Sequence, residues 1–195
     1  MGSRKAHQKI PEREKSNRGR GMTIGAVFFD RDDTLVKDTG YMYKIGDFQW
    51  MDGAISALLR LHSENISIFI ATNQGGIGKG LFTLAQMHAF HDHLQEQART
   101  EGIQITDIAF CPHHPEAVIA ELAQPCSCRK PEPGMLETLA KKWQIDLSAS
   151  VMIGDKLSDM QAGERAGCHA LQLTTDTNLP ELADIAIKII RKASA

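Results

Sequence analysis

The fold of this chain is decided by Ile24-Gly-Ala-Val-Phe-Phe29, an apolar run that ends abruptly in Asp30-Arg-Asp-Asp-Thr34. Nearly continuous apolar residues over this length are typical of a central strand in a parallel sheet, which helices cover on both faces. Two carboxylates, Asp30 and Asp32, follow directly, and carboxylates beside a buried strand are costly unless a site uses them. The stretch therefore predicts a buried strand that delivers both aspartates to a functional site.

Outward from this strand, strand-like and helix-like segments alternate along the chain. The predicted strands are 24–29, 66–71, 106–110, 150–153 and 169–173, with one more near 183–187. The predicted helices start near 52, run from 83 to about 100, from about 134 to 143, and from about 158 to 166. We expect Thr83 to cap the second helix, and a buried stripe on the first made of Ile55, Leu58, Leu59 and Leu61. This alternation predicts an α/β fold, a Rossmann-like parallel sheet with helices on both faces.

Polar residues follow four of these predicted strands, namely Asp30, Thr72, Cys111 and Asp155. Ligands of open α/β sheets bind at the carboxyl ends of the strands. We therefore expect the polar clusters to converge on one rim of the sheet.

The chain has 195 residues, which predicts one domain. Its 42% hydrophobic and 24% charged residues are close to globular averages and exclude general disorder. No apolar run approaches the ~18 residues that a membrane span needs. Residues 1–22 carry seven Lys or Arg against two Glu, and we expect a disordered extension before a single domain over 23–195. The remaining chain is acidic, which argues against nucleic acid as a partner. We also expect the protein to be cytoplasmic and monomeric.

Three further motifs offer groups that bind phosphate or a divalent cation. Thr72-Asn-Gln-Gly-Gly-Ile-Gly-Lys-Gly80 is rich in hydroxyl, amide and backbone donors, but Leu81 follows it, so it is not a P-loop. Arg129-Lys130 precedes a proline-stiffened turn and can bind phosphate. Gly154-Asp-Lys-Leu-Ser-Asp159 can complete a Mg²⁺ site with Asp30, because Mg²⁺ prefers oxygen ligands. The alternatives are a flexible glycine loop, a solvated basic pair, and helix capping by Asp155 or Ser158.

A fifth constellation consists of Cys111-x-His113 and Cys126-x-Cys128. Two such clips suit a closed tetrahedral Zn²⁺ site, and the alternative is four unrelated residues. We expect Cys168 to be an ordinary buried thiol and His114 not to be a ligand. Three histidines on the second predicted helix lack the i, i+4 spacing of a metal pair, so a solvated face is expected for His88, His91 and His93.

Together, the aspartate, threonine-asparagine, lysine and glycine-aspartate motifs resemble those of the haloacid dehalogenase superfamily of aspartate-nucleophile phosphatases, in the same order. The resemblance spans Val27 to Leu173. Gly40-Tyr41, Cys111-Pro-His-His-Pro115 and Pro133-Gly-Met135 are most similar to the branch of heptose-1,7-bisphosphate 7-phosphatases. The histidinol-phosphate phosphatases share the cysteine loop and the catalytic motifs, and remain the alternative.

The resemblance implies a Mg²⁺-dependent phosphatase of ADP-heptose synthesis, with a sugar bisphosphate as its partner. Asp30 would be the nucleophile and Asp32 the general acid and base. Mg²⁺ would bind Asp30, the backbone carbonyl of Asp32 and Asp155, with Asp159 orienting Lys156 or a metal-bound water. The residues implied to hold the phosphoryl oxygens are Thr72, Asn73 and Lys130. Those implied to contact the substrate are Asp38, Thr39, Gly40, Tyr41, Gln74, Gly75, Arg129 and Lys156. A structural zinc loop over 111–128 would take the place of a large cap.

One residue departs from the family pattern, because Asp33 stands where the family has glycine. Aspartate tolerates unusual backbone angles, so we expect the loop to form, with activity reduced by the added negative charge. Two alternative hypotheses belong to other functional classes. One is a sugar-phosphate-binding protein whose catalysis is silenced by Asp33, and the other is a zinc-dependent nucleic-acid-binding protein that uses the basic tail.

Overall fold

The computed structural model describes residues 24–195, so the predicted basic extension over 1–22 lies outside the described residues. The described chain is built on a five-stranded sheet with the order β3-β2-β1-β4-β5, and every strand pair is parallel. The strands are β1 Ala26–Phe29, β2 Ser67–Asn73, β3 Asp107–Cys111, β4 Val151–Gly154 and β5 His169–Gln172. The predicted α/β class is confirmed.

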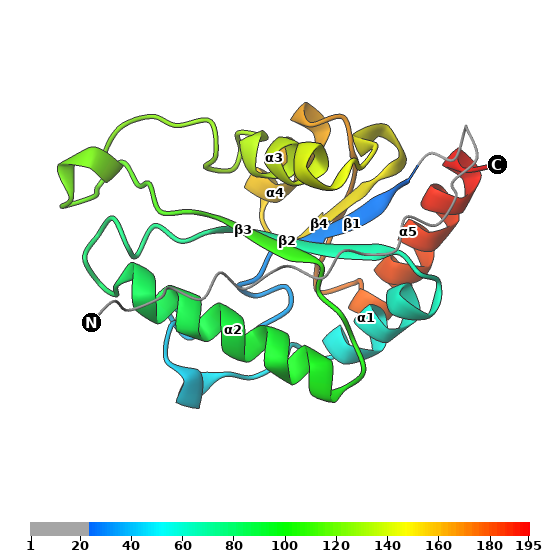
Figure 1. Cartoon of the computed structure of the whole chain (residues 1–195), viewed down its shortest axis with the longest axis horizontal. Helices are drawn as coiled ribbons and strands as arrows, with labels where there is room; N and C mark the ends of the chain where they lie inside the picture. Colours follow the sequence, from blue (N-terminus) through cyan, green and yellow to red (C-terminus); the bar gives the residue numbers. More distant parts are fainter. Residues whose placement is uncertain (1–23) are drawn as a thin grey trace, which may run out of the picture.

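Helices cover both faces of this sheet (Figure 1). They are α1 Ala54–Ser63, α2 Leu84–Thr100, α3 Gly134–Trp143, α4 Leu157–Arg165 and α5 Leu179–Ala193, with 3-10 turns η1 Ile45–Asp47, η2 Ala120–Leu122 and η3 Leu147–Ala149. In Figure 1, α3 and α4 lie above the sheet, and α2 lies below it. Within residues 24–195, no helix combines the length and the apolar character that crossing a membrane requires.

The central strand β1 explains why the decisive stretch is apolar throughout. Val27 and Phe29 pack into a core with side chains of α1, α2 and α5, whereas Ala26 and Phe28 pack into a second core with side chains of α3. All four residues are fully buried. Because successive side chains of a strand point to opposite faces, a strand between two helical layers needs apolar residues at every position.

Helix α2 begins as its sequence predicts. The Thr83 hydroxyl accepts a hydrogen bond from the backbone N–H of Gln86, and the Gln86 side chain accepts one from the backbone N–H of Thr83. This reciprocal capping satisfies two backbone donors that the first helical turn leaves free.

The strand predicted near 183–187 is wrong, because these residues lie inside α5. Asn178 caps that helix by accepting a hydrogen bond from the backbone N–H of Glu181. Its buried residues recur at helical spacing, namely Leu179, Leu182, Ala183, Ala186, Ile187 and Ile190. The stripe predicted for α1 is wrong at Leu59, which is 40% exposed, since Ala54, Ala57, Leu58 and Leu61 form the buried face.

The register of the sheet brings the carboxyl ends of β1, β2 and β4 to the same level. Phe29 pairs with Ile70 on one side and with Ile153 on the other. The backbone N–H of Asp30 continues this ladder by donating to the carbonyl of Ile153, at 2.9 Å. Asp30 therefore lies on the rim between the end of β2 and the loop that follows β4.

Candidate active site

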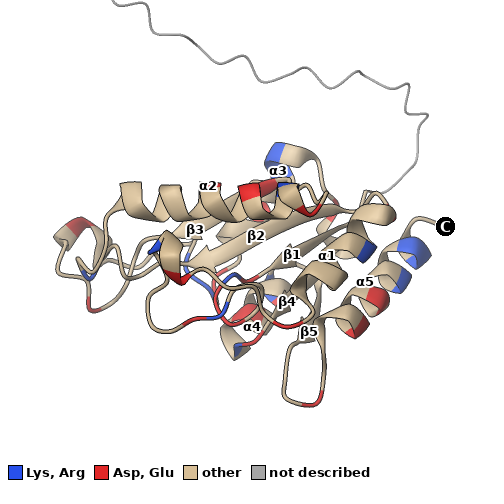
Figure 2. Ribbon diagram, turned by 90° about the horizontal axis from the view of Figure 1, so that it is seen from below, with Lys and Arg blue, Asp and Glu red and all other residues tan. Residues whose placement is uncertain are grey.

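Three carboxylates gather at this rim. Asp30 follows β1, Asp155 follows β4 and Asp159 lies in the first turn of α4. One oxygen from each of the three lies within 4.8 Å of the others. Acidic and basic segments meet in the loops around α4 and β4 in Figure 2. The convergence expected from the strand ends is therefore observed for the acidic residues.

A cavity of about 200 Å³ opens beside these carboxylates. Its lining contains Asp30, Asp32, Asp38, Gly40, Tyr41, Asn73, Gln74, Gly76, Lys130, Lys156, Ser158 and Asp159. Ten of these residues belong to the set predicted from the sequence, and Gly76 and Ser158 were missed. Thr39 lines a neighbouring cavity of about 350 Å³ with Gly40 and Tyr41. A larger cavity of about 630 Å³ lies near Gly25 and Trp143, but its single carboxylate, Glu64, is paired with Arg191.

Lys130 supplies a buried cation to the cluster. Its ammonium group lies 2.7 Å from a carboxylate oxygen of Asp30 and 2.7 Å from one of Asp159, and it donates to the carbonyl of Ala71 at 2.7 Å. Burial alone would lower the pKa of Lys130, but Asp30 and Asp159 raise it above its usual value. Lys130 is therefore a charged lysine that holds the acidic cluster together.

The acidic cluster fits a hard divalent cation. Burial raises the pKa of Asp155 and of Asp159, and the carboxylate of Asp30 raises both further. Asp159 also accepts from the backbone N–H of Lys156 at 3.0 Å, and a Cβ on Gly154 would lie 2.4 Å from an Asp159 oxygen. Asp159 contacts these neighbours through one oxygen and Lys130 through the other, whereas Asp155 makes longer contacts, at 3.2 Å with Thr34 and at 3.6 Å with Lys156. Carboxylate oxygens such as those of this cluster are the ligands that Mg²⁺ prefers.

Asp32 does not belong to the three-carboxylate cluster, and its side chain turns to Arg31 instead. The Nε of Arg31 donates to Oδ1 of Asp32 at 2.7 Å, and Nη2 donates to Oδ2 at 3.1 Å. Burial raises the pKa of Asp32, while Arg31 acts in the opposite direction. Arg31 is not among the residues predicted from the sequence, where its only signal is its position between Asp30 and Asp32.

The asparagine and threonine of the second motif are engaged with their neighbours. The Asn73 side chain donates to the carbonyl of Lys130 and accepts from the backbone N–H of Lys130, both at 3.0 Å. One amide hydrogen of Asn73 therefore remains for the cavity. The Thr72 hydroxyl is buried and accepts from Nε2 of Gln74 at 2.9 Å.

The glycine loop and Arg129 lie against the cysteine loop. A Cβ on Gly75 would approach His114 at 2.8 Å and Arg129 at 3.2 Å, so only glycine fits there. Arg129 itself donates to the carbonyl of His113 at 2.8 Å. Neither Gly75 nor Arg129 lines the 200 Å³ cavity.

Asp33 has the left-handed backbone expected of a position that favours glycine, with φ of 59°. The loop forms as predicted, and the Asp33 carboxylate accepts from the backbone N–H of Asp38 at 3.0 Å. Although partial burial lowers the pKa of Lys156, four aspartates that include Asp33 raise it above its usual value.

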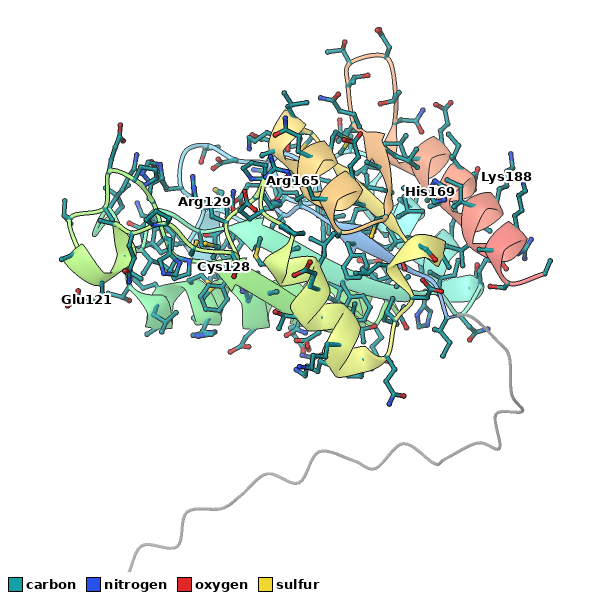
Figure 3. All side chains as sticks on the ribbon, turned by 90° about the horizontal axis from the view of Figure 1, so that it is seen from above. Glu121, Cys128, Arg129, Arg165, His169 and Lys188 are labelled. Atoms are coloured by element: carbon teal, nitrogen blue, oxygen red, sulfur yellow. The ribbon has the colours of Figure 1, made fainter. Side chains whose placement is uncertain are left out.

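The four predicted zinc ligands lie together at the end of β3. Their sulfur and Nδ1 atoms are 3.0–3.6 Å apart in each of the five contacts that join them. A regular tetrahedron around Zn²⁺ with ligands at ~2.3 Å has edges of roughly 3.7 Å, so the group of Cys111, His113, Cys126 and Cys128 fits this ion. In Figure 3, Cys128 and Arg129 lie close together, and Glu121 marks the outer end of the loop.

The remaining cysteine and histidines complete the sequence predictions. Cys168 is buried as expected, and burial raises the pKa of its thiol to about 12. His114 lies outside the zinc group, as expected, and accepts from the backbone N–H of Glu116. The solvated face predicted for His91 is wrong, because His91 is buried against Arg31, with 3.0 Å between His91 Nε2 and Arg31 Nη1.

Comparisons with known proteins agree with this geometry. A family model described as "HAD-hyrolase-like" matches residues 127–190. The chain is 40% identical over 144 residues to the D-glycero-alpha-D-manno-heptose-1,7-bisphosphate 7-phosphatase of Photorhabdus laumondii, covering 74% of this chain and 79% of the relative. It is 38% identical over 166 residues to the D-glycero-beta-D-manno-heptose-1,7-bisphosphate 7-phosphatase of Escherichia coli K12, covering 84% and 87%. The solved D,D-heptose 1,7-bisphosphate phosphatase of B. bronchiseptica, complexed with magnesium and phosphate, is similar with a TM-score of 0.72 and 28% identity, covering 84% of this chain and 98% of that one.

Proposed function

Because this chain belongs to the heptose-1,7-bisphosphate 7-phosphatase family of haloacid dehalogenase-like hydrolases, we propose that it removes the 7-phosphate from D-glycero-D-manno-heptose 1,7-bisphosphate. The observation that carries the proposal is the cluster of Asp30, Asp155 and Asp159 around the buried Lys130, beside a cavity large enough for a phosphoryl group. Two steps split the difficult hydrolysis into easier displacements on phosphorus.

In the first step, a carboxylate oxygen of Asp30 attacks phosphorus in line with the bond to the heptose C7 oxygen. The new bond is an acyl phosphate on Asp30, and the electron pair of the breaking bond stays on the departing oxygen. Lys130 lies 2.7 Å from one Asp30 oxygen and fixes the direction of the nucleophile. Positioning of this kind is a large part of catalysis in phosphoryl transfer.

Asp32 is the general acid and base in this proposal. It gives a proton to the departing heptose oxygen in the first step. In the second step it takes a proton from the water that attacks phosphorus, while the bond between phosphorus and the Asp30 oxygen breaks. The electron pair of that bond returns to the Asp30 carboxylate, and inorganic phosphate is released. The Asp32 side chain lines the cavity and is 15% exposed, so it can reach both oxygens. Burial raises the pKa of Asp32, which favours the protonated form that the first step needs.

The phosphoryl oxygens are held by donors around the cavity. We assign hydrogen bonding to the amide hydrogen of Asn73 that its contacts with Lys130 leave free. The three N–H groups of Lys130 are directed at Asp30, Asp159 and the Ala71 carbonyl, so we assign to Lys130 the stabilisation of the phosphoryl oxygens by its positive charge. Thr72 completes the predicted set and supports Gln74 at the cavity wall. Donors fixed before the reaction stabilise the charge that develops in the transition state without reorganising.

Two metal ions fit the residues present. Asp30, the backbone carbonyl of Asp32 and Asp155 would hold Mg²⁺, and the relative from B. bronchiseptica was solved with magnesium and phosphate. When bound, Mg²⁺ offsets the repulsion between the Asp30 carboxylate and the phosphate dianion. Cys111, His113, Cys126 and Cys128 would hold a structural Zn²⁺ that shapes the loop in place of a large cap.

We assign the contacts with the heptose to the loop over 38–41, and further contacts to Gln74 and Lys156 in the cavity wall. Gly75 and Arg129 lie outside this wall, and we assign them to the far end of the substrate. Tyr41 and Gly40 line both cavities at the rim, so this loop lies where the sugar leaves the phosphoryl pocket. Every assigned residue comes from one chain, and we propose that a monomer suffices. We place the reaction in the synthesis of ADP-heptose in the cytoplasm.

The test is phosphate release with Mg²⁺ from the α and β anomers of the heptose bisphosphate, because relatives named for each anomer are similar to this chain. Histidinol phosphate is the comparison substrate, and Asp30→Asn is the control for the nucleophile. Rapid release from one anomer that Asp30→Asn abolishes would support the proposal. Faster turnover of histidinol phosphate would refute the substrate, and bisphosphate binding without release would refute the activity.

A further inference from the structure

We propose that Arg31 and His91 are positioning residues that fix the carboxylate of Asp32 at the wall of the cavity. The inference rests on the proposed function, in which Asp32 is the general acid and base. It assigns a task to a buried arginine and a buried histidine that the catalytic steps themselves do not use.

Arg31 is fully buried, and all three nitrogens of its guanidinium group are engaged. Nε and Nη2 form a fork on the two oxygens of Asp32, at 2.7 and 3.1 Å. Nη2 also lies 2.8 Å from the carbonyl oxygen of Met42 and 3.1 Å from the Gln74 side-chain oxygen, so its two N–H groups are shared among three acceptors. The guanidinium carbon lies 4.8 Å from the centre of the Phe90 ring. An arginine held from this many sides cannot follow Asp32 if the carboxylate rotates.

His91 completes the set of acceptors around Arg31. The distance between Arg31 Nη1 and His91 Nε2 is 3.0 Å. A guanidinium group has only donors, so His91 Nε2 must be the acceptor and the imidazole must be neutral. Burial, followed by the nearby charge of Arg31, lowers the pKa of His91 to about 3, which agrees with a neutral ring. His91 belongs to α2 and therefore ties the catalytic loop to a long helix on one face of the sheet.

The fork defines the plane of the Asp32 carboxylate as well as its position. Two parallel hydrogen bonds from one planar group leave no free rotation about the last side-chain bond. Gln74 adds a third contact, with its Nε2 donating to Asp32 Oδ2 at 2.9 Å. A general acid must point at the departing oxygen, and a misplacement of about 1 Å can cost roughly 100-fold in rate.

This role predicts a dependence on the leaving group. The alkoxide of a sugar is strongly basic and needs a proton as it departs, whereas p-nitrophenolate departs without one. A misplaced Asp32 should therefore slow hydrolysis of the heptose bisphosphate and leave hydrolysis of p-nitrophenyl phosphate nearly unaffected. The parameter to compare is kcat/KM, because it reports the steps up to departure of the leaving group.

The first variant is His91→Leu, which leaves Arg31 Nη1 without its acceptor. We expect kcat/KM for the heptose bisphosphate to fall about 10- to 100-fold, which is part of the roughly 10²–10⁴-fold that general acid catalysis contributes, and kcat/KM for p-nitrophenyl phosphate to fall less than about threefold. His91→Gln supplies an amide oxygen near the position of Nε2 and should recover most of the loss. Arg31→Lys keeps the charge but not the fork, and should show the selective loss again.

His88→Leu is the matched control, because His88 lies one turn earlier on α2 and is exposed. His88→Leu should leave kcat/KM unchanged for both substrates. Thermal unfolding of each variant shows that it is folded before its kinetics are compared. Equal losses on the two substrates in the folded His91→Leu and Arg31→Lys variants would overturn the proposal, and so would failure of His91→Gln to recover activity.

The wild-type protein separates this inference from the proposed function. If it hydrolyses p-nitrophenyl phosphate but neither heptose anomer, the proposed substrate is wrong, and glycerol 3-phosphate takes the place of the alkyl substrate in the same comparison. The inference then stands or falls on the same selective loss. A folded wild-type protein that hydrolyses none of these substrates with Mg²⁺ would overturn both.

Discussion

Replacement of Lys130 by methionine tests whether one buried cation holds the acidic cluster together. The side chains of Lys130, Asp30 and Asp159 are 1%, 6% and 1% exposed, so water cannot replace the ammonium group. Removing one partner of a buried ion pair costs roughly 3–5 kcal/mol in the free energy of unfolding. For a domain of this size, this predicts a melting temperature lower by about 6–20 °C.

The matched control is Lys156→Met, which makes the same chemical change a short distance away. The Lys156 side chain is 54% exposed and lies 3.6 Å from Asp155. Because solvent screens an exposed pair, we expect a loss of roughly 0–1 kcal/mol. Both variants are followed by thermal unfolding in the same buffers, monitored by circular dichroism.

The pH dependence of Lys130→Met has a definite sign. Burial raises the pKa of Asp159 and Lys130 lowers it, so the variant raises this pKa further. An acid whose pKa is higher in the folded than in the unfolded state destabilises the fold when it is ionised, and stability returns as the pH falls through the folded-state pKa. The deficit of Lys130→Met should therefore shrink between pH 7.5 and pH 5, and adding Asp159→Asn should recover part of it.

Two results would refute this reasoning. One is a Lys130→Met protein that melts within about 2 °C of Lys156→Met at pH 7.5, since a buried and an exposed pair would then be equivalent. The other is a deficit that is the same at both pH values, because an uncompensated buried carboxylate must respond to protonation.

Three further predictions follow from other parts of the structure. Asp33→Gly should raise kcat/KM for the bisphosphate by roughly two- to tenfold, because it removes a negative charge near the site, and the repulsion between two like charges in water is about 1 kcal/mol at a separation of ~4 Å. A decrease in kcat/KM measured by steady-state kinetics would contradict this prediction. A strong zinc chelator should lower the melting temperature of the wild-type protein but not that of Cys128→Ser, and equal shifts would exclude a structural zinc. Leu58→Ala should cost about 2–5 kcal/mol in urea unfolding, whereas Leu59→Ala should cost less than about 1 kcal/mol, so equal costs would contradict the burial of this helix.

The position of the acidic site could be predicted because it depends on topology. A parallel sheet places the carboxyl end of every strand at one edge, so Asp30 after β1 and Asp155 after β4 had to meet. The zinc group was predictable for a related reason, because Cys111-x-His113 ends one strand and the two-clip spacing leaves few other arrangements. Neither inference required the orientation of a side chain.

The predictions that were wrong about the fold rested on a short window of sequence or on a single residue. Residues 183–187 are apolar enough for a strand, and only the longer window with Asn178 and Pro180 shows a capped helix. Leu59 is one residue from the buried stripe of α1, and a small rotation about the helix axis decides which neighbour is covered.

Arg31 could not be placed from the sequence because its burial depends on acceptors that are distant in the chain. Met42, Gln74 and His91 are 11, 43 and 60 residues away, and each supplies one acceptor. Without these acceptors, burial of a guanidinium group would cost too much folding free energy. An arginine whose acceptors are unknown is therefore predicted to be exposed. The same dependence explains why His91 was expected in solvent.

The two buried cations at this site, Arg31 and Lys130, pair with different carboxylates. Lys130 pairs with Asp30 and Asp159, whereas Arg31 pairs with Asp32, so the proposed nucleophile and the proposed acid are held by different cations although they are two residues apart. Separate partners hold the two carboxylates independently, and the proposed chemistry gives each of them a different role. A single shared cation would couple the two, because each change in the protonation of Asp32 would change how strongly that cation pairs with Asp30. The separate ion pairs of Asp30 with Lys130 and of Asp32 with Arg31 therefore suit the proposed chemistry, because each carboxylate can act without releasing the other.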